Sequence, residues 1–247
     1  MITIFTDGSS RGNPGPGGWG SVVVADDRVI ELGGGEKNTT NNRMELMAAI
    51  GGLKKTSEIS GDVEGVNVVV NSDSSYVIKG ITMWVHGWKR NGWKTANKGD
   101  VSNVDLWQML DDAVAQIGSK NVSWKYVGGH IGIAGNERCD EIATSYADGE
   151  HPELYDGPLS GYTIKNILDV SHDEGLLKAK KSSSSSKAKS GAKAYSYVSS
   201  VGGKIEVHRT WAECEKRVKG AKGARFKKSF DPVNEKEIID EYGALLF

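Results

Sequence analysis

Hydrophobic and polar positions at the start of the chain predict an antiparallel β-meander. Three short runs are rich in β-branched and aromatic residues, and turn-forming pairs such as Asp7-Gly8 and Asp26-Asp27 separate them. Runs of this length and composition are typical of strands, and loops this short join antiparallel neighbours. We therefore expect strands over 2–6, 19–25 and 28–33.

The period of the hydrophobic positions changes after this meander. Leu46, Ile50 and Leu53 recur at i, i+4 and i+7, which predicts a helix over about 42–55. The nearly continuous β-branched stretch over 66–70 is typical of a strand covered on both faces. The following pattern predicts a strand over 122–127 and helices from Ser74, over 104–117 and over 136–146. This order predicts an α/β fold in which helices pack against a mixed sheet.

The rest of the chain divides into a linker and a small C-terminal module. The pattern is weak over 150–175, and 178–193 is a low-complexity stretch rich in Ser and Lys without an aromatic residue. Because such a stretch cannot bury enough apolar surface to offset its ordering entropy, we expect it to be a linker. The predicted division is a domain over 1–149, a linker over 150–193 and a module over 194–247.

Charge and cysteine content narrow the class of protein. The net charge of the 247 residues is −1, yet 178–228 contains 15 basic and three acidic residues. Such a block suits a partner with many phosphates, although a solubilising tail is an equal alternative. Two cysteines form no disulfide framework, and neither a signal peptide nor a membrane-spanning stretch is evident. We therefore expect a cytoplasmic protein without membrane contact and without an obligatory protein partner.

Four acidic residues lie where predicted strands end or predicted helices face the sheet: Asp7, Glu45, Asp73 and Asp140. Chemistry in open α/β sheets collects just beyond strand ends. Neighbouring carboxylates repel one another unless cations neutralise them, and Mg²⁺ or Mn²⁺ prefers such oxygen ligands. Each residue also has a structural alternative, as a turn residue, a helix cap, half of a capping box or a solvent-facing acid. Spacing alone leaves these alternatives open.

Five stretches within residues 1–149 resemble bacterial-type ribonuclease H, type 1, in that family's order and spacing. They are FTDGSSRGNPGPGGWG, TTNNRMELMAAI, NSDSSYVIKGI, GWKTANK with NVDLWQ, and VGGHIGIAGNERCDEIA. The resemblance implies an α/β fold with a mixed five-stranded sheet and flanking helices. It also implies an endoribonuclease that cuts the RNA strand of RNA–DNA hybrids and leaves 3′-hydroxyl and 5′-phosphate ends.

The resemblance carries roles to individual positions. The family's catalytic, metal-binding acids match Asp7, Glu45, Asp73 and Asp140, which implies two bound Mg²⁺ ions, with Mn²⁺ as the alternative. The histidine that assists product release or moves a proton matches His130, and Glu137 and Arg138 have expected supporting roles. Contacts with the hybrid are expected from Asn13, Thr40, Asn41 and Asn42. Ser75 stands where many bacterial members carry glutamine, so no contact is expected from it.

A segment rich in tryptophan and basic residues lies between Gly80 and Trp107. Aromatic faces beside cations suit a nucleic-acid groove, although Trp84 and Trp88, four apart on a helix, are equally typical of a small satellite core. The segment resembles the basic protrusion with which the bacterial enzymes grip the DNA strand. Substrate contacts are expected from Trp88, Lys89, Arg90, Trp93 and Lys94.

Residues 195–230 resemble the hybrid-binding domain of eukaryotic-type ribonuclease H, which also occurs in viroplasmin-like proteins, through TWAEC, RVKG and GARFKKSF. This resemblance implies a small α+β fold that tethers the hybrid. The tryptophan that stacks on DNA and the lysines that hold phosphates match Trp211, Lys227 and Lys228. Thr210 and Glu213 predict a capping box. The first loop carries fewer cations than is usual, which predicts weaker and less salt-sensitive binding; a stabilising appendage without affinity is the alternative.

Two other functions remain open on the sequence alone. One is a protein that binds hybrids or double-stranded RNA with an idle catalytic fold, although none of the four acids is missing. The other is a nuclease of the same fold that acts on DNA, such as a junction resolvase, against which Asn41-Asn42 and the protrusion argue. The catalytic hypothesis requires residues 7, 45, 73 and 140 to lie close enough to share cations.

Overall fold

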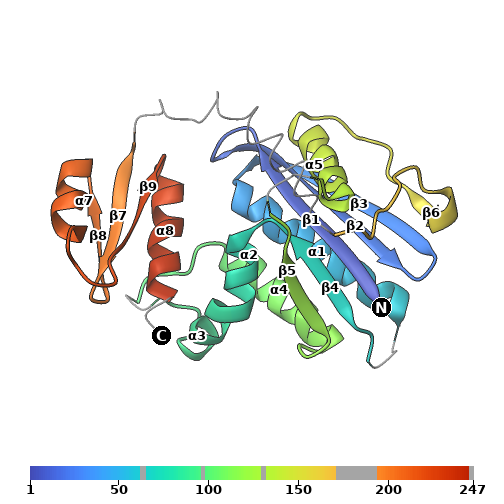
Figure 1. Cartoon of the computed structure of the whole chain (residues 1–247), viewed down its shortest axis with the longest axis horizontal. Helices are drawn as coiled ribbons and strands as arrows, with labels where there is room; N and C mark the ends of the chain where they lie inside the picture. The colour runs from blue at the N-terminus through green and yellow to red at the C-terminus, as the bar shows by residue number, and fades with distance from the viewer. Residues whose placement is uncertain (62–64, 96–97, 129–131, 171–193, 245–247) are drawn as a thin grey trace. The chain divides into compact units, whose positions relative to one another are not determined.

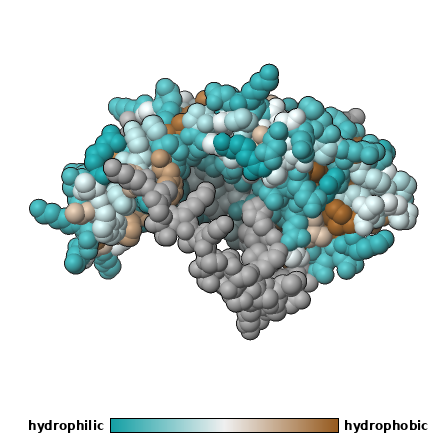
Figure 2. Space-filling model, turned by 90° about the horizontal axis from the view of Figure 1, so that it is seen from above, coloured by the Kyte–Doolittle hydropathy of each residue, from teal (hydrophilic) through white to brown (hydrophobic). Residues whose placement is uncertain are grey.

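The computed structural model describes residues 1–61, 65–95, 98–128, 132–170 and 194–244. The chain divides into two compact units, the first drawn from 1–81 and 105–183 and the second from 82–104 and 184–247. No helix in the described part of the chain combines the length and hydrophobicity needed to cross a membrane. The face of the molecule drawn in Figure 2 is mostly hydrophilic, with hydrophobic residues few and scattered.

The first unit is built on a mixed sheet of six strands in the order β5-β4-β1-β2-β3-β6 (Figure 1). The strands are β1 (Ile2–Ser10), β2 (Gly15–Ala25), β3 (Arg28–Thr39), β4 (Val68–Ser72), β5 (Val122–Tyr126) and β6 (Asp156–Pro158). β1, β2 and β3 form an antiparallel meander, whereas β4 runs parallel to both β1 and β5. The α/β class expected from the sequence is confirmed, with β6 as a sixth strand.

The helices of the chain up to residue 161 are α1 (Asn41–Ser60), α2 (Ser75–Lys79), the π-helix η1 (Gly80–Trp84), α3 (Val85–Arg90), α4 (Val104–Ile117), α5 (Ala134–Ala147) and the 3₁₀ turn η2 (Leu159–Gly161). α1 and α5 cover opposite faces of the sheet. A Cβ on Gly52 of α1 would lie 2.6 Å from the side chain of Ile4, whereas one on Gly135 of α5 would lie 2.4 Å from the ring of Phe5. Because Ile4 and Phe5 are neighbours on β1, their side chains point to opposite faces of the sheet.

The meander strands are longer than their hydrophobic runs predict. Pairing between β1 and β2 continues to Ser10 opposite Gly17, and β3 runs on to Thr39. Glycine and serine have low β-propensity, so their share of the sheet is not visible in the hydrophobic pattern. Because β1 continues to Ser10, Asp7 lies inside this strand rather than at its end.

Residues 150–170 differ from the expected linker, because the described part of this stretch is folded onto the first unit. β6 pairs with β3, and Tyr162 and Ile167 are buried in a hydrophobic cluster with Phe5 and Val22. The apolar residues of this stretch occur singly or in pairs among polar residues, glycines and prolines, so their pattern is weak. The low-complexity stretch 178–193 lies outside the described residues.

The second unit contains a sheet of three strands in the order β8-β7-β9. Its strands are β7 (Ser196–Val201), β8 (Lys204–His208) and β9 (Arg225–Ser229), and its helices are α7 (Trp211–Val218) and α8 (Pro232–Ala244). Val198 of β7 packs with Ile238 and Tyr242 of α8. The expected small α+β module is confirmed, and so is the capping box of Thr210 and Glu213 at the start of α7.

Candidate active site

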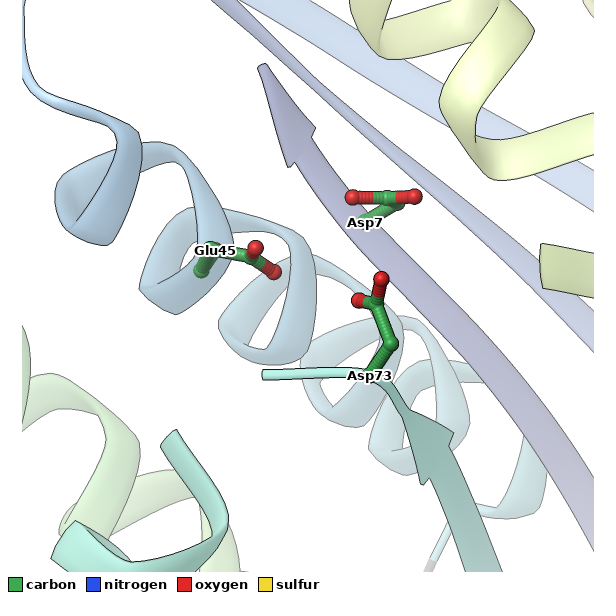
Figure 3. A group of neighbouring side chains, drawn as sticks. All are labelled: Asp7, Glu45 and Asp73. Atoms are coloured by element: carbon green, nitrogen blue, oxygen red, sulfur yellow. The ribbon is translucent and has the colours of Figure 1, made fainter. Parts of the chain in front are cut away.

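Three carboxylates converge at one edge of the central sheet. Asp7 lies on β1, Glu45 on the first turns of α1, and Asp73 directly after β4. One carboxylate oxygen of each lies within 4.8 Å of those of the other two. Figure 3 shows the three side chains pointing toward one another. This arrangement places three potential oxygen ligands around one point.

Strand register explains why Asp7 and Asp73 meet. β1 and β4 are parallel neighbours, with Thr6 opposite Ser72, so the next residue along each strand, Asp7 and Asp73, lies at the same level of the sheet, where β4 ends and β1 continues. Glu45 is brought in because α1 lies directly against β1: a Cβ on Gly8 would be 2.3 Å from the backbone nitrogen of Glu45. Glycine at position 8 therefore allows the helix to approach the acid beside it.

Helix capping accounts for neither Glu45 nor Asp73. Thr40 is the N-cap of α1, and its hydroxyl accepts a hydrogen bond from the backbone N–H three residues later at 3.4 Å. Ser74 caps α2 in the same way at 3.3 Å. Instead, Glu45 Oε1 accepts a hydrogen bond from the side chain of Asn41 at 3.3 Å. The two acids are therefore not used as caps, and Glu45 is held by Asn41.

The electrostatic environment disfavours ionisation of the cluster when no cation is bound. Burial, followed by the charges of Asp73 and Asp140, raises the pKa of Asp7 to about 8, although the N–H of Gly8 opposes this. Burial, followed by the charges of Asp7 and Asp73, raises the pKa of Glu45 well above its usual value. Glu45 Oε2 is buried and accepts no hydrogen bond from any residue that the structure describes. Buried, repelling carboxylates with an unsatisfied oxygen fit the donor set of a hard divalent cation.

Asp140 lies near this cluster rather than within its tightest part. It is on α5, and the three-residue group within 4.8 Å does not include it, but its charge acts on Asp7. Asn136, one turn earlier on α5, is buried and donates a hydrogen bond to Asp7 Oδ2 at 3.4 Å. Asn136 was not predicted from the sequence. The available signal was its i, i+4 spacing from Asp140, which places both on one face of the helix.

His130 lies outside the described residues, so the structure does not place it. Glu137 accepts a hydrogen bond from the backbone N–H of Gly132 at 3.1 Å, just after the undescribed stretch 129–131. Arg138 forms an ion pair with Glu31 of β3 at 2.8 Å. Glu137 thus contacts the loop before α5 and Arg138 contacts the sheet, and their expected supporting roles stay predictions.

The polar residues expected to contact substrate lie on two segments of the first unit. Thr40, Asn41 and Asn42 form the start of α1, just before Glu45, and Asn41 is exposed. Asn13 lies in the loop between β1 and β2 and is half-buried. The α1 group is therefore close in sequence and in space to a member of the acidic cluster, through the bond from Asn41 to Glu45.

The protrusion residues divide into buried tryptophans and exposed cations. Trp88 is only 1% exposed and packs against Trp84, with the ring centroids 5.8 Å apart. The expectation that Trp88 offers an aromatic face to nucleic acid is therefore corrected, because that face is inside a small core. The basic residues predicted to contact substrate, Lys89, Arg90 and Lys94, are exposed, and Trp93 is half-buried. Of these, Lys94 pairs with Asp100.

An exposed aromatic group lies on one face of the second unit's sheet. Trp211 is 37% exposed, and its ring lies 5.6 Å from that of Tyr197 and 5.0 Å from that of Phe226. Lys228 is directly opposite Tyr197 in the sheet, so it points to this same face. We call these residues the aromatic face: Tyr197, Trp211, Phe226 and Lys228. Only Trp211 and Lys228 of this group were predicted from the sequence.

Lys227 points to the other side of the sheet. Neighbouring residues in a strand alternate between faces, and Lys227 forms an ion pair of 2.5 Å with Glu241 on α8. Glu241 is largely buried, whereas Lys227 is about half-exposed. The two adjacent lysines therefore cannot lie together on the aromatic face.

Such a carboxylate cluster can hold the divalent cations with which metal-dependent hydrolases act on phosphate esters. The chain belongs to the RNase H family, because the model of the family described as RNase H matches residues 1–148. A second model, described as the Ribonuclease H1 N-terminal domain, matches residues 196–235. Both resemblances stated from the sequence are confirmed.

Individual relatives support this family assignment. A Ribonuclease H of Cyanothece sp. is 54% identical over 152 residues, which are 61% of this chain and 92% of that protein. A Ribonuclease H of Pseudomonas fluorescens is 53% identical over 147 residues, 60% of this chain and 92% of that protein. The crystal structure of LC9-RNase H1, a type 1 RNase H with the type 2 active-site motif, is 31% identical with a TM-score of 0.54. The match covers 68% of this chain and 83% of that one.

Proposed function

We propose that this protein is an endoribonuclease that hydrolyses the RNA strand of RNA–DNA hybrids and leaves 3′-hydroxyl and 5′-phosphate ends. The observation that carries the proposal is the convergence of Asp7, Glu45 and Asp73 within 4.8 Å in a domain of the RNase H family. Relatives more than half identical over this domain bear the name Ribonuclease H.

The acidic residues would hold two divalent ions, Mg²⁺ or alternatively Mn²⁺. The residues that would hold them are Asp7, Glu45, Asp73 and Asp140. When bound, such ions supply the Lewis acidity that activates water and stabilises the departing 3′-oxygen of a phosphodiester. The chain's own contribution is orientation: Asn136 holds Asp7, and Asn41 holds one oxygen of Glu45, whose other oxygen is buried without a hydrogen-bond partner among the described residues. We assign proton movement or product release to His130.

Substrate contacts are assigned by side-chain chemistry and, for the basic residues, also by exposure. Amide and hydroxyl groups at Asn13, Thr40, Asn41 and Asn42 suit 2′-hydroxyls and phosphates, which allows cleavage without base recognition. Exposed cations at Lys89, Arg90 and Lys94, with Trp93 beside them, suit DNA phosphates and sugars. The neutral groups are proposed to act at the scissile strand and the cations on the DNA strand.

The C-terminal module is proposed to tether the hybrid. The aromatic face offers rings for stacking and one lysine for a phosphate. We propose three functional parts: a catalytic domain over 1–149, a linker that includes 178–193 and a binding module over 194–247. Tethering raises the local concentration of hybrid at the catalytic domain, which favours repeated cuts.

We propose the cytoplasm as the site of this activity. The chain's two cysteines, Cys139 and Cys214, are buried free thiols, as is common in a reducing compartment.

A substrate panel tests the proposed activity. The intact protein is incubated with Mg²⁺ and end-labelled RNA–DNA hybrid, double-stranded RNA, double-stranded DNA and a four-way DNA junction. Cleavage confined to the RNA of the hybrid, with 3′-hydroxyl ends, is expected. Preferential junction cleavage would favour a resolvase, and binding without cleavage would favour an idle catalytic fold.

Variants then assign the chemistry to the cluster. Asp7→Asn is expected to abolish cleavage, whereas Asp112→Asn, which replaces an exposed acid of α4, is expected to leave the rate unchanged. Equal rates for Asp7→Asn and the wild type would refute the assignment. Removing residues 178–247 is expected to weaken hybrid binding and processivity while single-turnover cleavage at saturating protein persists.

A further inference from the structure

A buried ion pair joins α5 to the sheet beside the acidic cluster. The Glu31 side chain on β3 is 1% exposed, and the Arg138 guanidinium on α5 meets both of its oxygens, at 2.8 and 2.9 Å. Burial alone raises the pKa of Glu31, but the hydrogen bonds it accepts outweigh this and the net pKa lies below its usual value. A carboxylate buried in this way is stable only if its remaining acceptor sites are also satisfied.

The stretch after the matched catalytic domain supplies those remaining hydrogen bonds. The hydroxyl of Tyr162 donates to Glu31 Oε1 at 2.6 Å, and the backbone N–H of Tyr155 donates to Oε2 at 3.0 Å. Arg138 also donates to the backbone carbonyl of Glu153 at 3.4 Å. Tyr162 itself is buried in the hydrophobic cluster on this face of the sheet. We call Glu31, Arg138 and Tyr162 the clamp.

The clamp contacts the N-terminal half of α5, which carries the residues that act on Asp7. Arg138 lies between Asn136, which holds Asp7, and Asp140, whose charge acts on Asp7. The start of α5 has no side-chain cap, so contacts with the rest of the fold must fix it. A Cβ on Gly20 would lie 2.4 Å from the carbonyl oxygen of Cys139, so the helix has no room to move toward the sheet. The clamp restrains it against moving away.

We propose that Tyr162 is a positioning residue for catalysis. By completing the hydrogen bonds of Glu31, it holds Arg138 and thereby fixes Asn136 and Asp140 on α5 relative to Asp7. Residues 150–167 are then a functional part of the catalytic domain, although the family model ends at residue 148. This inference rests on the proposed function.

Two tyrosine variants of the full-length protein provide a matched test. Tyr162→Phe removes the hydroxyl that reaches Glu31. Tyr155→Phe removes a hydroxyl of the same segment that donates only to the exposed carbonyl of Pro158, and it keeps the backbone N–H that reaches Glu31. The measurements are kcat and KM for hybrid cleavage, hydrogen exchange of the amides over 134–140, and the melting temperature.

Tyr162→Phe is expected to lower kcat about ten-fold, because small misplacements of catalytic groups slow the reaction steeply. KM for the hybrid should stay within about two-fold, because the clamp touches no proposed substrate contact. Exchange over 134–140 should be faster, and the melting temperature about 5 °C lower. Tyr155→Phe should resemble the wild type in kcat and in exchange.

The outcomes separate this inference from the proposed function. A Tyr162→Phe protein with a lower melting temperature but unchanged kcat and unchanged exchange over 134–140 would overturn the positioning role and leave only a structural one. Equal effects of the two variants would also overturn it. If the wild type cleaves no hybrid, the proposed function fails, and faster exchange over 134–140 in Tyr162→Phe alone still supports the clamp.

Discussion

Replacing Asp7 by asparagine tests the electrostatic account of the acidic cluster. Asparagine has nearly the same shape but no charge, and it retains an oxygen for the N–H of Gly8, which bonds to Asp7 at 2.7 Å. The change therefore removes repulsion with Asp73 and Glu45 without opening a cavity. We expect the metal-free variant to be more stable than the metal-free wild type and to be inactive.

The magnitude follows from proton linkage. The Asp7 carboxyl has an ordinary pKa of 3.8 and a pKa of about 8 in the folded protein. Below pH 3.8 the group is protonated in both states; as the pH rises from there to 8, the unfolded chain ionises first and stability is lost. At pH 7 the unfolded chain has gained from about three pKa units of this difference. The free energy of unfolding is therefore lower by on the order of 4 kcal/mol. Asp7→Asn should recover much of this, a rise in melting temperature of about 10 °C.

The assay is thermal unfolding of chelator-treated protein between pH 5 and 8, repeated with added Mg²⁺. Wild-type stability should fall as the pH rises, and Asp7→Asn should flatten that dependence. Mg²⁺ should raise the melting temperature of the wild type, since a ligand that binds only the folded state stabilises it, and should act much less on the variant. Asp112→Asn, on the exposed side of α4, should behave like the wild type throughout.

The reasoning would be refuted by a metal-free Asp7→Asn protein that is less stable than the wild type at pH 7. It would also be refuted by an equal stabilising effect of Mg²⁺ on both proteins, because the cluster would then not be where the ion binds.

Three further predictions concern other parts of the fold. Lys228→Ala is expected to weaken hybrid binding by the full-length protein about five-fold in anisotropy titrations, whereas Lys227→Ala should mainly lower the melting temperature because Lys227 pairs with α8; the opposite order would contradict the face assignment. Glu31→Gln should cost about 3 kcal/mol at pH 7 in urea unfolding. Because the pKa of Glu31 is lowered in the folded protein, its stabilisation is present above the ordinary pKa of 4.5 and is lost as the pH falls through the folded-state value. A difference between Glu31→Gln and wild type that stays constant from pH 7 to 3 would contradict this. Gly20→Ala, which places a Cβ 2.4 Å from the carbonyl of Cys139, should cost about 3 kcal/mol, and an unchanged urea midpoint would show that α5 can move away.

Local features of the chain were predictable from the sequence because they depend on near neighbours. The helix over 104–117 is found with the same bounds, since its hydrophobic positions repeat at the helical period. The capping box of Thr210 and Glu213 is a contact across three residues, and it forms as expected. The motifs that resemble the RNase H family are likewise continuous stretches of sequence, so they are sufficient to identify the family.

Tertiary structure decided which side chains meet and which faces stay exposed. Asp7 and Asp73 come together through the register of two parallel strands, and Trp88 is buried because Trp84 packs against it. The clamp joins Glu31 to Arg138 across 107 residues and is closed by a stretch whose hydrophobic pattern is too weak to predict structure. Hydrophobic period and capping carry information over one or two turns. Contacts of this kind depend instead on how closely distant backbones can approach, so only the folded chain determines them.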